Sequence, residues 1–333
     1  MIDRYRLLLL TATLVLLSNA ASVRAETELS DPRLVRPLPV HNMYPAMLRF
    51  FDPVPASALE TNEKQVELGV VQHYSSIYQY DQLPEGQLLA DMEIYTLELL
   101  GDIAVTDTLT LGVTLPWHYA WDGFMDGFLR DFHDALGFPN GGRELRPDDD
   151  YQWYYRDPDG TDVWRDEPGW EPGNAVLRLK QQIMHSDHDG LAVLAAMQLP
   201  TGSVTRGWSN GEPDVAAGLV YSRRGSAWFA HLEGWGIIPL KKADPGIEYN
   251  AYFRGSFALG RVLTRRISLL AQIQGGTSPY SSGIAELDNS PVQFSFGANW
   301  LVTPRSMLKF TFVENINQDT TPDFGFTVGF SYR

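Results

Sequence analysis

Large apolar residues occupy every second position in many short stretches of this chain. In the last ten residues Phe324, Phe326, Val328, Phe330 and Tyr332 alternate with small or polar residues. Side chains of a β-strand point to alternate faces, so each stretch predicts a strand with one apolar and one polar face. About twelve stretches share this pattern: 66–74, 95–103, 109–117, 175–183, 191–199, 215–221, 228–233, 249–259, 267–274, 292–300, 308–312 and 324–332. The fold class is therefore predicted to be all-β.

The connections between these strands alternate between short and long. Short ones fall at 106–107, 186–190, 222–226, 261–265 and 303–305, and long ones at 79–88, 118–173, 201–214, 239–247, 277–291 and 315–323. An even strand number, with short turns at one end and long loops at the other, is typical of bacterial outer-membrane barrels. We predict a transmembrane antiparallel β-barrel over residues 65–333, with the long loops extracellular.

Aromatic residues at the predicted strand ends fit this interpretation. Tyr221, Trp300 and Tyr332 fall near the rim of short turns, and Trp117 and Tyr249 near the rim of long loops. Amphipathic rings are favoured at both membrane interfaces. Closing the sheet also satisfies every edge N–H and C=O group, as a hydrocarbon environment requires.

The first 25 residues have the pattern of a secretory signal peptide. Arg4 and Arg6 precede an apolar run over 7–17, and Val23 and Ala25 provide a small-residue cleavage pattern. A retained membrane anchor is the alternative, but the apolar run is short for one. We exclude residues 1–25 from the fold and predict cleavage after Ala25.

Residues 26–64 are rich in proline, which disfavours a central strand or a long helix. Apolar side chains such as Met43, Tyr44 and Phe50 lie between the prolines and argue against a free, solvated tail. Two interpretations remain open. The segment packs onto or into the barrel, as a small plug, or it is a periplasmic linker.

The composition narrows the class of protein. The 333 residues include no cysteine and carry a formal net charge of −15, and the mean hydropathy is −0.20. This hydropathy excludes a bundle of membrane helices, and the acidic balance argues against nucleic acid as a partner. An exported chain without cysteine fits the bacterial envelope. We expect outer-membrane lipid, lipopolysaccharide and the barrel-assembly machinery as partners, and no cofactor.

The longest predicted loop contains an amphipathic pattern. Phe124, Phe128 and Phe132 recur four residues apart and predict a helix over 122–136, which also carries His133. A glycine-rich run up to Arg143 ends it. The helix covers the mouth of the barrel as a lid, or it lies on neighbouring loops.

An acidic run, Asp148 to Asp150, follows this predicted helix. Oxygen clusters suit hard cations such as Ca²⁺, but no calcium-loop pattern is present. A solvated acidic loop is therefore the favoured interpretation.

Charged residues on the polar faces of the strands are predicted to line the lumen: Glu98, Arg178, Lys180, Glu233 and Arg254. An arginine facing lipid at mid-depth would cost about 2–4 kcal/mol. Counting across the loop between their strands places Glu233 opposite Arg254, which predicts a direct ion pair.

Candidates for catalysis are weak. His73 and Ser75 lie two apart and share one face of the first strand, but no third group is identifiable, so polar residues at a barrel rim are the favoured interpretation. A metal cluster of His73, His118 and His133 is weaker still, and we predict no metal site.

Several segments together resemble a known family: 132–137 with Arg143, 198–203 with 211–214, 274–280 and 322–324. They are similar to the proteobacterial outer-membrane family catalogued as domain of unknown function 3187, over nearly the whole mature chain. The resemblance implies an outer-membrane barrel and brings no assigned reaction.

A lumen of Gln, Ser, Thr and mixed charge favours a channel or transporter for a small solute. The alternatives are a lipid-modifying barrel hydrolase and a structural or adhesion barrel.

Overall fold

Along the barrel strands, large apolar side chains point outward and the polar side chains between them point into the interior. In the computed structural model Leu232 and Phe253 are 59% and 53% exposed, whereas their neighbours Glu233 and Arg254 are both 5% exposed. The described residues are 31–59, 65–84, 86–128, 130–131, 147–316 and 320–333. Within them, no helix is long and apolar enough to cross a membrane.

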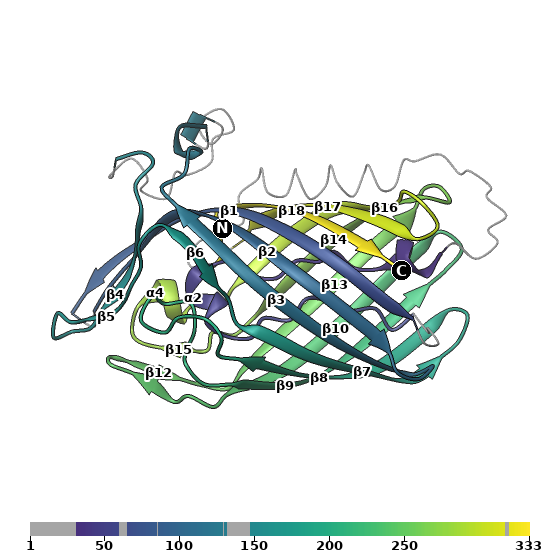
Figure 1. Cartoon of the computed structure of the whole chain (residues 1–333), viewed down its shortest axis with the longest axis horizontal. Coiled ribbons are helices and arrows are strands. Elements are labelled where there is room, and N and C mark those ends of the chain that lie inside the picture. The colour runs from purple at the N-terminus through teal and green to yellow at the C-terminus, as the bar shows by residue number, and fades with distance from the viewer. Residues whose placement is uncertain (1–30, 60–64, 85, 129, 132–146, 317–319) are drawn as a thin grey trace.

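The strands close into an antiparallel barrel (Figure 1). The first strand, β1, pairs with the last, β18, and this contact completes a ring of 12 strands. The ring comprises β1 (Val66–Leu83), β2 (Gly86–Ala104), β3 (Leu109–Trp121), β7 (Ala175–His185), β8 (Asp189–Leu199), β9 (Asp214–Arg224), β10 (Trp228–Pro239), β13 (Tyr252–Val262), β14 (Ile267–Gly276), β16 (Val292–Leu301), β17 (Ser306–Asn315) and β18 (Phe324–Tyr332). The predicted barrel and its strands are confirmed.

The remaining elements lie in the long loops or before the barrel. Short strands β4 (Gln152–Arg156), β5 (Asp162–Arg165) and β6 (Gly169–Pro172) extend the sheet along β2 and β3. Strands β11 (Ala243–Asp244), β12 (Ile247–Tyr249) and β15 (Tyr280–Ser281) form a second small sheet, and helix α4 covers Ala285–Asp288. Helix η1 (Pro32–Val35) and helix α2 (Pro45–Leu48) precede β1.

Two details of the predicted loops and rims are wrong. Residues 79–88, predicted to form a long loop, instead extend β1 and β2, which pair as far as Leu83 and Gly86. Polar residues such as Gln79 and Asp81 resemble a loop in sequence, although they continue the strand pairing. Tyr249, predicted on the outer rim, belongs to β12 and is 4% exposed, because its ring packs against Phe50.

Residues 31–59 lie inside the barrel, and we call them the lumen segment (Figure 1). It begins at the end of the short turns, where Arg33 donates to the carbonyl of Pro304. It reaches the end of the long loops at α2, where Tyr280 donates to the carbonyl of Ala46. It then returns toward the short turns, where the amide of Ala58 donates to Ser222. The lumen segment is therefore U-shaped.

Candidate functional site

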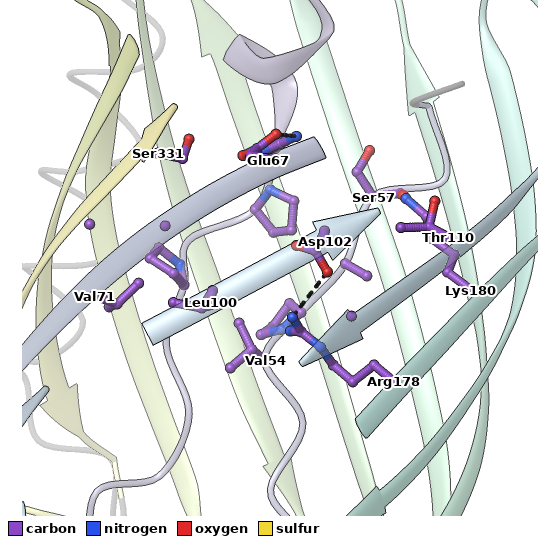
Figure 2. Close-up of a pocket in the computed structure, with 18 of the residues that line it drawn as sticks. Val54, Ser57, Glu67, Val71, Leu100, Asp102, Thr110, Arg178, Lys180 and Ser331 are labelled. Carbon is purple, nitrogen blue, oxygen red and sulfur yellow. Dashed lines mark hydrogen bonds and ion pairs between the residues drawn. The ribbon is translucent and has the colours of Figure 1, made fainter. Parts of the chain in front are cut away.

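A cavity of about 210 Å³ lies between the barrel wall and both arms of the lumen segment, the entering arm before α2 and the returning arm after it, in the half of the lumen nearer the short turns. Figure 2 shows Val54 and Ser57 of the lumen segment beside Asp102 of β2 and Arg178 of β7. The cavity's charged lining residues are Arg36, Glu67, Asp102, Arg178, Lys180, Lys309 and Arg333. Five of these side chains are basic and two are acidic. The cavity is thus lined by an excess of positive charge in a chain that is acidic overall.

The ion pairs in this cavity connect neighbouring parts of its wall. Arg36 of the lumen segment donates to both carboxylate oxygens of Glu67, at 2.5 and 2.8 Å. Arg333 also pairs with Glu67. Lys180 and Lys309 donate to the carbonyls of Ser57 and Pro37, at 3.0 and 3.2 Å. Lys180 and Lys309 therefore bind the lumen segment as well as lining the cavity.

Gly112 makes room for an ion pair between strands that are not direct neighbours. In the register it lies opposite Asp102 on one side and Arg178 on the other. Arg178 Nη2 lies 3.2 Å from Asp102 Oδ1, across the glycine (Figure 2). A Cβ on residue 112 would lie 2.3 Å from that carboxylate oxygen, so a larger residue would displace the pair.

Farther along the lumen, Glu98 joins the lumen segment to the wall. Its two oxygens lie 2.9 Å from Nε2 of His41 and 3.3 Å from Nε2 of His73. His73 Nδ1 lies 2.9 Å from the hydroxyl of Thr327. The hydrogen-bond partners of His73 are therefore Glu98 and Thr327, and the weak catalytic candidate Ser75 is not among them.

The predicted ion pair between Glu233 and Arg254 is wrong. Arg254 instead donates through Nε to Asp52 of the lumen segment, at 2.6 Å. Glu233 accepts from the amide of Ala56 at 2.7 Å and from Trp235 Nε1 at 2.5 Å. The actual register places Glu233 opposite Ser256, two positions from Arg254. Both side chains point inward, and each binds the lumen segment.

At the end of the long loops the lumen segment lies in an aromatic cluster. The ring of Phe50 meets those of Tyr249 and Tyr280 edge-on, with centroids 5.0 and 5.1 Å apart. Arg49 is fully buried, stacks on Trp164 and pairs with Asp244 at 2.8 Å. Burial would raise the pKa of Asp244, but the charge of Arg49 and hydrogen bonds from Lys241 and Tyr249 hold it below its ordinary value.

The two arms of the lumen segment are connected through one wall histidine. His231 Nε2 lies 2.5 Å from the carbonyl of Val35, so it donates, and its Nδ1 lies 2.7 Å from the hydroxyl of Ser222. Ser222 in turn accepts from the amide of Ala58. One polar chain therefore holds the entering and the returning arm together.

The loop residues predicted as a separate helix do not join this site. Phe124 and Phe128 are 66% and 57% exposed. Residues 126–128 and 130–131 are helical, whereas Phe132, His133 and Arg143 lie outside the described residues. His118 is buried in the lumen, where it binds Thr96 and stacks on Trp208.

The sequence interpretation did not identify His41, Arg49 or Asp52. They lie in the proline-rich segment, which has no strand or helix period from which a face can be read. One feature of the sequence could have indicated these residues. Charged residues inside an apolar stretch need partners when that stretch is buried.

The family model described as a protein of unknown function, DUF3187, matches residues 13–333. The chain belongs to this family. No curated protein sequence matches this chain.

Solved structures share the barrel. An outer-membrane channel from Pseudomonas putida F1 is 13% identical, with a TM-score of 0.55 over 84% of this chain and 99% of that one. The NanC porin is 7% identical, with a TM-score of 0.50 over 80% of this chain and 99% of that one. At these identities the similarity shows the fold of this DUF3187 member.

Proposed function

We propose that this protein is an outer-membrane channel for small anionic solutes, and that the lumen segment closes it in the state described. The observation that carries the proposal is the cavity of about 210 Å³ beside the lumen segment, lined by five basic and two acidic side chains. A cleft with charge of one sign and low-dielectric walls concentrates ions of the opposite sign. The similarity of the fold to a solved channel and a solved porin supports the transport class.

The contacts of the lumen segment support a reversible closure. It is held by hydrogen bonds, ion pairs and side-chain packing, and the chain contains no cysteine that could fix it covalently. Lys180 and Lys309, which line the cavity, both donate to its backbone carbonyls. An anion in the cavity competes with these carbonyls for the same ammonium groups. Its entry therefore favours release of the entering arm at Pro37 and of the returning arm at Ser57.

Ion selectivity in planar bilayers tests the solute class. Under a KCl gradient, the reversal potential of the full-length protein is expected to show anion preference. Lys180→Gln and Lys309→Gln each shift it toward cations, and the double variant shifts it further. Arg265→Gln is the matched control, because Arg265 is an exposed basic residue in a short turn and leaves the cavity unchanged. Cation preference in the unmodified protein, or an equal shift in the control, would refute an anionic solute.

A further inference from the structure

We propose that His41, His73 and Glu98 form a binding site for a divalent transition-metal ion, best matched by Zn²⁺, which ties the lumen segment to the barrel wall. His41 belongs to the lumen segment, His73 to β1 and Glu98 to β2. All three are buried, and one ligand atom from each lies within 4.8 Å of the other two. Metal binding itself does not depend on the proposed transport function.

The geometry brings three suitable ligand atoms together. Nε2 of His41 and Nε2 of His73 approach opposite oxygens of the Glu98 carboxylate, at 2.9 and 3.3 Å. The two imidazole rings meet edge-on, with centroids 5.3 Å apart. Zinc binds imidazole nitrogen and carboxylate oxygen at about 2.0–2.2 Å, so small side-chain rotations bring all three atoms to bonding distance.

The surroundings of the cluster also suit a metal. The ring of His73 is oriented by Thr327, which lies 2.9 Å from its Nδ1, and such partners fix the tautomer of a metal-bound histidine. A cavity of about 50 Å³, lined by His41, Glu98, Asp52 and His118 among others, adjoins the cluster. It is large enough for a water molecule, which can serve as the fourth ligand.

The ligand set indicates the class of metal. Two imidazoles with one carboxylate suit zinc and neighbouring first-row ions, whereas calcium and magnesium prefer sites built entirely from oxygen. The sequence separates His41 from Glu98 by 57 positions, so the site forms only when the lumen segment is in place. Bound metal therefore stabilises the closed arrangement of the lumen.

Titration with Zn²⁺ tests the site directly. The full chain, purified in detergent after removal of metal with a chelator, is titrated by calorimetry, and Co²⁺ serves as a visible-absorption probe of four-coordinate geometry. One ion is expected to bind per chain. His41→Ala and Glu98→Gln abolish this binding, and Thr327→Val weakens it by about 10–100-fold through loss of the partner of His73.

His231→Gln provides the matched control. His231 is also a buried lumen histidine that binds the lumen segment, but it is not part of the cluster. The His231→Gln variant should bind Zn²⁺ as the unmodified chain does. Circular dichroism of every variant establishes that the barrel is folded, and His41→Ala leaves the barrel wall unchanged. Absence of stoichiometric binding to the full chain, or equal binding by folded His41→Ala, overturns the proposal. A protein that binds Zn²⁺ but conducts no ions in its metal-free form overturns only the transport function.

Discussion

The carboxylate of Asp52 in the lumen segment accepts a hydrogen bond from Arg254 of β13, at 2.6 Å. Their side chains are 9% and 6% exposed, so the pair is removed from solvent. It joins the segment to the wall at a position where the sequence alone predicted a pair within the wall. Like Glu233 and Glu98, Arg254 therefore has its partner in the lumen segment.

Asp52→Asn should loosen the lumen segment, because it leaves Arg254 buried without its counter-ion. Breaking a buried pair costs about 3–5 kcal/mol, which corresponds to at least about a hundredfold in the closed-to-open ratio. Ala46→Cys, at a fully buried position of α2, serves as the reporter in this cysteine-free chain. Its reaction with a small thiol reagent should accelerate in Asp52→Asn. It should be unchanged in Asp107→Asn, an exposed residue of a short turn. Equal rates of thiol reaction in the reporter alone, with Asp52→Asn and with Asp107→Asn would contradict the role of the pair.

Gly190→Ala should displace the returning arm of the lumen segment. A Cβ at this position of β8 would lie 1.9 Å from the carbonyl oxygen of Ala58, so the arm must move away. A buried reporter, Ser57→Cys, should become more reactive toward the same reagent. Gly236→Ala is the control, because nothing lies within 4 Å of the added carbon. An unreactive reporter in Gly190→Ala would show that the arm does not pack against β8.

The long loops are expected on the cell exterior. Asp149→Cys lies at an exposed position between β3 and β4, and Arg223→Cys lies near a short turn at the opposite end of the barrel. On intact cells an impermeant thiol reagent should label the first and leave the second unlabelled. Labelling of both after lysis confirms that each cysteine is accessible. The reverse pattern on intact cells would invert the topology.

Acid should release the tip of the lumen segment through Asp244. Burial alone would raise the pKa of this carboxyl, but Arg49, Lys241 and Tyr249 hold it below 3.8. Because the folded-state pKa is the lower one, the stabilisation is fully present above about pH 4 and is lost as the pH falls through the folded-state value. Pepsin cleavage within 45–51 should therefore be faster in Asp244→Asn at pH 4, and the difference should shrink toward pH 2. A constant difference over this range would exclude Asp244 as the titrating group.

The alternation of residues predicted the barrel and the direction of its side chains. Phe253 and Phe257 lie outside and Arg254 lies inside because strand geometry alone determines these faces. The pairing register between neighbouring strands was harder to predict from the sequence. A shift of two positions keeps every side chain on its face, so the pattern could not separate Ser256 from Arg254 as the partner of Glu233.

The contents of the lumen could not be read from the sequence. Proline-rich residues 31–59 have no period, and their hydrogen bonds go to wall and loop residues up to 278 positions away, as from Asn42 to Thr320. Such contacts depend on the closed barrel as a whole. The positions of His41 and Asp52 therefore emerge only once all the strands are assembled.

Single-channel recording of the protein with and without residues 31–59 tests the central claim most directly. The full chain in a planar bilayer is expected to be mostly closed, with brief openings. The deletion variant, verified as a folded barrel by circular dichroism, is expected to show large and steady conductance steps. The same conductance in both proteins would contradict the account that the lumen segment closes the channel.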